Sequence, residues 1–181
     1  MKIINTANII SFFRLFSVPI ILLMILEDEM KIAFWIFIFA SITDIFDGYF
    51  ARIRNEVSSL GTFLDPIADK LLVAAVILIL TSKEVIADWE TIPALIILLR
   101  EIVVSGLREY LAGIKVSVPV SKIAKLKTSL QLIALGILIL SESGISVVPI
   151  ILLGKIALWL AAILTLYTGY DYLKSGFKHL K

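Results

Sequence analysis

The sequence predicts an all-α integral membrane protein with six transmembrane helices and with both termini in the cytoplasm. Of its 181 residues, 60% are hydrophobic, and the mean hydropathy of +1.02 is typical of chains that fold in a lipid bilayer. Apolar runs such as "LLVAAVILIL" recur along the whole chain between short charged breaks. We expect a single membrane domain over residues 1–181, because six such helices leave no room for a second domain.

Six segments each have close to the roughly 20 residues that a helix needs to cross the hydrocarbon of a bilayer. The first resembles a signal peptide, but Arg14 interrupts its apolar run and no small-residue cleavage site follows. The second, third and fourth combine an apolar part with a charged part, and the fifth and sixth are apolar nearly throughout. Short connections favour packing between sequential, antiparallel neighbours. The segments are residues 8–27, 32–52, 61–82, 92–112, 123–141 and 146–170.

The distribution of basic residues predicts the orientation. With the N-terminus in the cytoplasm, the lysines and arginines outside the apolar runs lie toward the cytoplasm, apart from Lys31, Lys83 and Lys155. Such a basic face attracts anionic lipid head groups, so membrane lipids are expected partners and nucleic acid is not. We expect a multi-pass protein of the cytoplasmic (inner) membrane. The chain has no cysteine, which excludes disulfides and thiolate metal sites.

Ionisable side chains begin inside the predicted membrane layer. The apolar runs of the second, third and fourth segments stop at Asp44, Lys70 and Arg100, about 12–18 Å into a layer of about 30 Å. A charge at this depth costs about 2.5–3.5 kcal/mol or more, so these groups should face a polar cavity open to the cytoplasm. For a single charge, the alternative is a structural ion pair, such as Glu101 with Arg108.

Four aspartates fall in the second and third segments. On a helix, Asp44 and Asp47 lie about 60° apart, and Asp65 and Asp69 share one face, so the four carboxylates can meet. Grouped carboxylates repel one another unless protons or cations neutralise them. Oxygen ligands suit Mg²⁺ or Mn²⁺, and two such ions about 3.5–4 Å apart can clamp the reacting oxygens of a phosphoryl transfer. The sequence therefore predicts a site for two divalent ions, with the active site facing the cytoplasm.

Small residues accompany the aspartates. Gly48, Ala51 and Gly61 either make room for a flat base or a diphosphate, or only let the helices pack closely. Arg52 is available as a fork-shaped partner for phosphate oxygens.

Together, these residues form the pattern D-x2-D-G-x2-A-R-x8-G-x3-D-x3-D from residue 44 to residue 69. This pattern resembles the signature of the CDP-alcohol phosphatidyltransferases. The resemblance implies a six-helix membrane enzyme, usually a homodimer, that displaces CMP from a CDP-linked lipid with a second alcohol. It implies that Asp44, Asp47 and Asp65 hold the metal ions, and that Asp69 is a further ligand that takes the proton from the attacking hydroxyl.

The segment "NIISFFR" resembles the opening of bacterial members, where Asn8 and Ser11 could approach the nucleotide. The resemblance thus implies a set of residues in contact with CDP-diacylglycerol, namely Asn8, Ser11, Gly48, Ala51, Arg52, Ser58 and Gly61.

Two further segments bear on the acceptor. "REIVVSGLREY" and "KLKTSLQ" resemble stretches of phosphatidylglycerophosphate synthases, which use sn-glycerol 3-phosphate, although Ala124 stands where that pattern usually has glycine. An acceptor with its own phosphate needs a second anion site. The expected phosphate-binding residues are Arg100, Arg108, Lys125 and Lys127. Head-group attraction and pairing with nearby glutamates are the alternative, which fits Lys115 and Lys122 but not the deeper Arg100.

Other functions stay open at this point. The nearest is a sister enzyme with another acceptor, such as serine, inositol phosphate or a phospholipid. A divalent-cation channel or carrier could also place carboxylates in a cytoplasmic vestibule. It would not need the glycine, alanine and arginine positions, and the chain has no visible inverted repeat. His179 is expected to be solvated, and the sixth segment has no assigned role.

Overall fold

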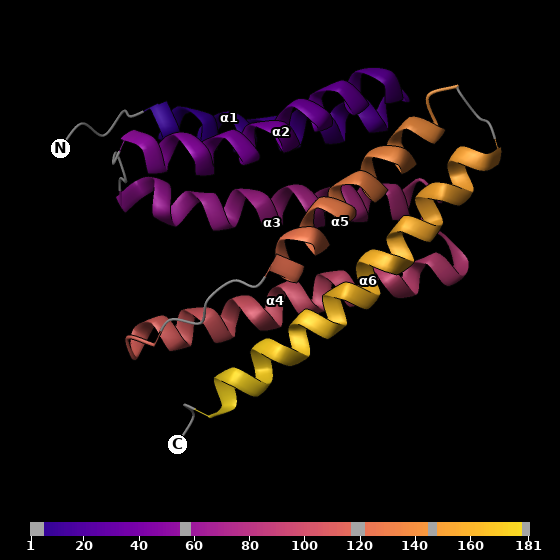
Figure 1. Cartoon of the computed structure of the whole chain (residues 1–181). Helices are drawn as coiled ribbons and strands as arrows, with labels where there is room; N and C mark the ends of the chain where they lie inside the picture. The colour runs from indigo at the N-terminus through magenta and orange to yellow at the C-terminus, as the bar shows by residue number, and fades with distance from the viewer. Residues whose placement is uncertain (1–5, 55–58, 117–121, 145–147, 179–181) are drawn as a thin grey trace. The chain divides into compact units, whose positions relative to one another are not determined.

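The computed structural model describes the backbone of residues 6–54, 59–116, 122–144 and 148–178. Side chains are described within these ranges except at residues 6–10, 44–54, 59–63, 65 and 122. In this part of the chain, all regular structure is helical (Figure 1), which confirms the predicted all-α class. The long helices are α1 (Thr6–Leu26), α2 (Met30–Arg54), α3 (Ser59–Ser82), α4 (Thr91–Gly113), α5 (Lys122–Ser141) and α6 (Val148–Phe177).

The helices correspond to the six expected segments, and the largest difference is at α6, which continues past residue 170 to Phe177. By length and composition, two stretches of the described chain could cross a membrane, Ile123–Ser141 with 19 residues and Val148–Phe177 with 30. Shorter apolar stretches occupy Ser11–Leu26 and Met30–Thr43. Six spans and cytoplasmic termini stay predictions.

The exterior of the helices is apolar. Large hydrophobic side chains are exposed on most of the long helices, among them Phe16, Trp35, Leu78, Ile102 and Ile163. Water-soluble monomers rarely expose so much contiguous apolar surface. This surface favours a lipid environment.

By its internal contacts, the chain divides into two compact units. Unit 1 comprises Met1–Val85 and Leu138–Val147. In it, α1 packs against both α2 and α3, and the core includes Ile21, Phe37 and Leu80.

The turn between α1 and α2 is tight, and Asp28 adopts a φ of 61°. Lys83 stabilises this turn, because its Nζ donates to the Leu26 carbonyl at 3.1 Å and pairs with the Asp28 carboxylate at 2.6 Å. The end of α1 thereby gains a partner for one of its free carbonyl groups.

Unit 2 comprises Ile86–Ile137 and Val148–Lys181, and begins with the short 3₁₀ helix η1 (Asp88–Glu90). In it, α4 packs against α6. Their contacts follow the same order along both helices: Glu90 pairs with Lys155 at 3.2 Å, and Arg100 bonds Thr168 at 3.1 Å. The two helices are therefore parallel.

In unit 2 this arrangement corrects the expectation of sequential, antiparallel neighbours, whereas in unit 1 the sequential helices α1 and α2 pack together as expected. The main partner of α4 is α6, because α5 carries the chain back and lets α6 run in the direction of α4 (Figure 1).

Glycines let α6 approach α4 closely. A Cβ at Gly176 would lie 2.7 Å and 2.9 Å from the two terminal methyl carbons of Leu107, and one at Gly169 would lie 3.0 Å from Cγ of Arg100. Close backbone approach through small residues is a common way for helices to pack in membranes.

We expect Gly176→Ala to destabilise unit 2 by about 1–3 kcal/mol, the range for overpacking a tight contact, because Leu107 must move. Thermal unfolding of the detergent-solubilised protein measures this loss. Gly106→Ala is the matched control, since a Cβ at Gly106 meets nothing within 4 Å. Equal melting temperatures for the two variants would contradict the α4–α6 contact.

Candidate active site

The four aspartates lie on two helices that share a neighbour. Asp44 and Asp47 are on α2, Asp65 and Asp69 are on α3, and α1 packs against both helices. Of the four, only Asp69 has a described side chain. Among the side chains that can be described, no three His, Cys, Asp or Glu residues group together. The four-aspartate metal site therefore stays a prediction.

Most of the expected nucleotide contacts also stay predictions. Asn8 lies on α1, Gly61 lies on α3, and α2 carries Gly48, Ala51 and Arg52. The side chains at all five positions are outside the described part of the structure. Ser58 and His179 lie outside the described residues. Ser11 is described and is buried on α1.

Asp69 forms an ion pair with Arg14 of α1. The side chain of Arg14 is 1% exposed and that of Asp69 is 43% exposed. A buried guanidinium in an apolar helix needs a carboxylate partner, because an uncompensated buried charge is strongly destabilising. The pair therefore ties α3 to α1 and fixes the orientation of Asp69, while part of its carboxylate remains accessible.

Arg14 was not among the expected site residues. Its signal was present in the sequence, because an arginine inside an apolar segment requires a partner within the protein.

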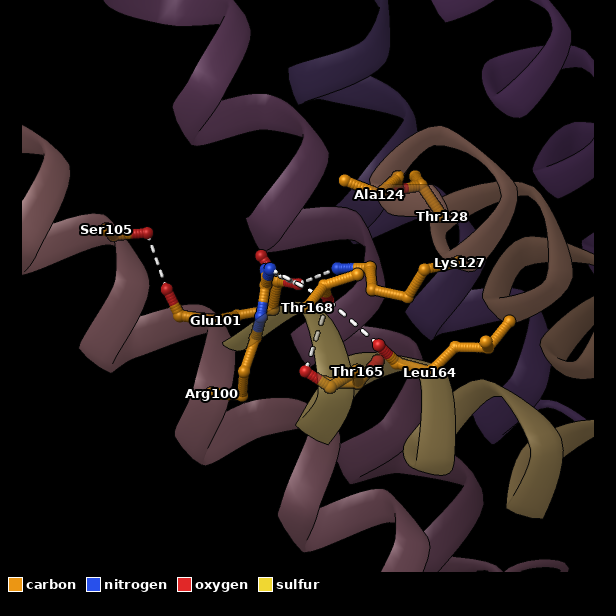
Figure 2. Close-up of polar contacts among 9 residues, drawn as sticks. All are labelled: Arg100, Glu101, Ser105, Ala124, Lys127, Thr128, Leu164, Thr165 and Thr168. Atoms are coloured by element: carbon orange, nitrogen blue, oxygen red, sulfur yellow. Dashed lines mark hydrogen bonds and ion pairs between the residues drawn. The ribbon is translucent and has the colours of Figure 1, made fainter. Parts of the chain in front are cut away.

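A second group of charges gathers in unit 2 (Figure 2). Glu101 of α4 lies between two cations: Nη1 of Arg100 donates to its Oε1 at 3.2 Å, and Lys127 of α5 forms an ion pair with the same oxygen. Nη2 of Arg100 also donates to Oγ1 of Thr168 on α6 at 3.1 Å. The side chains of Arg100, Lys127 and Glu101 are 11%, 4% and 20% exposed. Side chains of three helices thus meet around Arg100 and Glu101.

Arg108 extends this group. Its Cζ lies 5.7 Å from the centre of the Tyr172 ring, and Cζ of Arg100 lies 5.8 Å from the same ring. Arg108 is exposed, whereas Tyr172 is buried. We call Arg100, Arg108, Lys127, Glu101 and Tyr172 the basic cluster.

The basic cluster has three cations and one carboxylate, so its net charge is positive. Nε of Arg100 is buried and has no hydrogen-bond partner within the described chain. Such an excess of guanidinium and ammonium groups suits a phosphate or carboxylate anion. Of the four residues expected to bind phosphate, Arg100, Arg108 and Lys127 belong to the cluster, whereas Lys125 is exposed on α5.

The alternative of a structural ion pair holds for Glu101, although its partner is not Arg108. Glu101 pairs with Arg100 and Lys127 instead. Two helical turns, about 10.5 Å along the axis, separate Glu101 from Arg108, and the cation that α5 supplies is nearer. Pairing with a nearby glutamate, the alternative set aside for Arg100, is present in the structure.

Thr168 and Tyr172 were not expected at the site. Neither residue differs in type from the many threonines and tyrosines that pack in apolar helices, so the sequence carried no signal for them. Their contribution depends on the parallel packing of α6 against α4.

Comparison with known proteins agrees with the sequence pattern. The sequence model of the CDP-alcohol phosphatidyltransferase family matches residues 4–167. A curated relative from Rickettsia typhi is 48% identical over 174 residues, which cover 94% of this chain and 96% of the relative. One from Rickettsia bellii is 48% identical over 178 residues, with 97% of both chains covered.

A more distant relative, from Bacillus subtilis, is 34% identical over 192 residues, with 98% of this chain and 97% of the relative covered. All three relatives are named CDP-diacylglycerol–glycerol-3-phosphate 3-phosphatidyltransferase.

Glu101→Gln should lower the stability of the protein by roughly 3–5 kcal/mol, because it leaves Arg100 and Lys127 buried without their shared carboxylate. Thermal unfolding in detergent measures the loss. Asp28→Asn is the control, since Asp28 is 77% exposed and its pair with Lys83 should contribute only about 0–1 kcal/mol. An unchanged melting temperature for Glu101→Gln would mean that Glu101 does not balance these cations.

Proposed function

Because this chain belongs to the CDP-alcohol phosphatidyltransferase family, we propose that it transfers the phosphatidyl group of CDP-diacylglycerol to sn-glycerol 3-phosphate. The products are CMP and phosphatidylglycerophosphate. One observation carries this proposal: over nearly the whole chain, it is 34–48% identical to relatives whose names specify this donor and this acceptor.

The basic cluster supports an acceptor that carries a phosphate. Serine would bring no phosphate to Arg100, Arg108 and Lys127, whereas glycerol 3-phosphate would neutralise their excess positive charge. Guanidinium groups bind phosphate oxygens with two parallel hydrogen bonds, which also fixes the orientation of the acceptor. Lys125, exposed on the same helix as Lys127, would attract the anion as it approaches.

We assign two divalent ions, Mg²⁺ or Mn²⁺, to Asp44, Asp47, Asp65 and Asp69. The residues fit such ions in two respects: all the donors are carboxylate oxygens, and α1 packs against both helices that carry them. When bound, the ions supply positive charge that stabilises the diphosphate during transfer. The contacts to the cytidine diphosphate part fall to Asn8, Ser11, Gly48, Ala51, Arg52, Ser58 and Gly61.

In this reaction, Asp69 accepts the proton of the 1-hydroxyl of glycerol 3-phosphate. The hydroxyl oxygen forms a bond to the lipid-side phosphorus, and the bond from that phosphorus to the CMP oxygen breaks. Arg14 supports this role, because its ion pair with Asp69 holds the carboxylate in one orientation. Catalysis of this kind depends on positioning and electrostatics, without a covalent enzyme intermediate.

We further propose that all six helices cross the cytoplasmic membrane, with the termini and the active site on the cytoplasmic side. In this proposal, two copies of the chain form a homodimer. The two long apolar stretches, the exposed hydrophobic side chains and the bias of lysine and arginine support this placement. It would let water-soluble glycerol 3-phosphate reach the basic cluster while the acyl chains of the donor stay in lipid.

We expect purified protein, incubated with CDP-diacylglycerol and Mg²⁺ or Mn²⁺, to release CMP when sn-glycerol 3-phosphate is the acceptor. It should release little CMP when serine or inositol phosphate is the acceptor. Neutralising Arg108 should raise the KM for glycerol 3-phosphate, because the acceptor phosphate loses one cation. Chromatography of the nucleotide and lipid products measures both effects. CMP release with serine alone, unaffected by the change at Arg108, would identify a sister enzyme instead.

Asp69→Asn should abolish CMP release, because an amide cannot accept the hydroxyl proton. The variant also weakens the pair with Arg14, so its melting temperature and its elution from a sizing column must be compared with those of the unmodified protein. Asp28→Asn, which removes an exposed carboxylate, should retain full activity. Normal turnover by folded Asp69→Asn would refute the assigned role.

A further inference from the structure

Helix α6 contacts the buried arginine of the basic cluster through three residues. Oγ1 of Thr168 accepts a hydrogen bond from Arg100 at 3.1 Å and itself donates to the Leu164 carbonyl at 2.9 Å. A Cβ at Gly169 would lie 3.0 Å from Cγ and 3.5 Å from Nε of Arg100. The Tyr172 ring centre lies 5.8 Å from Cζ of Arg100. Thr168, Gly169 and Tyr172 thus border one arginine.

The two arginines of α4 share the Tyr172 ring. On α4, Arg100 and Arg108 are separated by about 12 Å along the helix axis, yet both guanidinium groups reach one ring. The parallel packing explains how: Arg100 is level with Thr168, and Leu107 is level with Gly176. Tyr172 therefore lies between the two levels, and the two side chains converge on it.

The two guanidinium groups beside this ring carry like charges, so each needs a neighbouring group that attracts cations. The π face of an aromatic ring attracts cations, and more strongly where water is excluded. Tyr172 is only 5% exposed. Its hydroxyl is buried and has no hydrogen-bond partner in the parts of the chain that are described. The ring, rather than the hydroxyl, therefore makes the contacts to the arginines.

We propose that α6 positions the anion-binding arginines, and that Tyr172 sets the affinity for the acceptor phosphate by holding Arg100 and Arg108 against its ring. Tyr172 is a positioning residue that acts through the arginines. The inference rests on the function proposed above and adds to it a role for the last helix. Thr168, Gly169 and Tyr172 all follow residue 167, where the match to the family's sequence model ends.

The decisive comparison is between Tyr172→Leu and Tyr172→Phe, assayed by CMP release with each substrate varied in turn. Tyr172→Leu should raise the KM for glycerol 3-phosphate by roughly three- to tenfold, the effect of losing cation–π contacts of this kind. Its KM for CDP-diacylglycerol and its kcat should change little. Tyr172→Phe should behave like the unmodified protein, because it keeps the ring and removes only an unpaired hydroxyl.

A glycine pair gives an independent test. Gly169→Ala should shift the side chain of Arg100 and raise the KM for glycerol 3-phosphate without affecting the KM for CDP-diacylglycerol. Gly106→Ala, on α4, makes the same chemical change where a Cβ meets nothing within 4 Å, and should leave both KM values unchanged.

The outcomes separate the two proposals. If the unmodified protein releases no CMP with glycerol 3-phosphate, the proposed function fails. If it is active but Tyr172→Leu retains its KM for glycerol 3-phosphate, the role of Tyr172 is refuted while the function stands. A fall in kcat with every acceptor and donor, shared by Tyr172→Phe, would assign Tyr172 a purely structural role and overturn the inference.

Discussion

The constraint on which the site in unit 2 depends is the pairing of charge in an apolar interior. Arg100 and Lys127 lie on different helices, and both are held by one oxygen of Glu101. Because a buried charge that loses its partner is strongly destabilising, α4 and α5 cannot separate or slide past each other without cost. Thr168 adds α6 to the same point. These charges and their polar partner thus fix the register of three helices.

The same constraint acts in unit 1. Arg14 is buried in α1 and is held by Asp69 of α3, while α1 also packs against α2, which carries Asp44 and Asp47. In the proposed enzyme, α1 would act as the common support for both aspartate-bearing helices, although it contributes no aspartate to the signature. The arginine that interrupts its apolar run links it to the helix of the proposed base. In the proposed enzyme, this apparent defect in an apolar segment would be part of the site's support.

The sequence predicted the number and type of the helices because apolar periodicity and length are local properties. For example, the fourth segment was expected over residues 92–112, and the helix that contains it is Thr91–Gly113. It predicted the partners of charges poorly, because those depend on which helices pack together. Spacing on one helix offered Arg108 as an alternative partner for Glu101, but Arg100 and Lys127 of α5 pair with it. The end of α6 was placed too early, since residues after 170 are less apolar while still helical. Tyr172 carried no signal, for its role exists only beside α4.

The contacts of Tyr172 and Thr168, which the sequence did not predict, reflect how cations are held in an apolar interior. An anion site in lipid needs cations, but cations in an apolar interior repel each other and must be held by neutral groups as well as by carboxylates. In the proposed site, a second carboxylate would cancel the charge that attracts the acceptor phosphate. An aromatic ring and a hydroxyl hold a guanidinium while leaving its charge intact, and Tyr172 and Thr168 provide them. Gly169 allows α6 close enough for both contacts. An apolar helix can therefore shape a charged site without contributing any charge of its own.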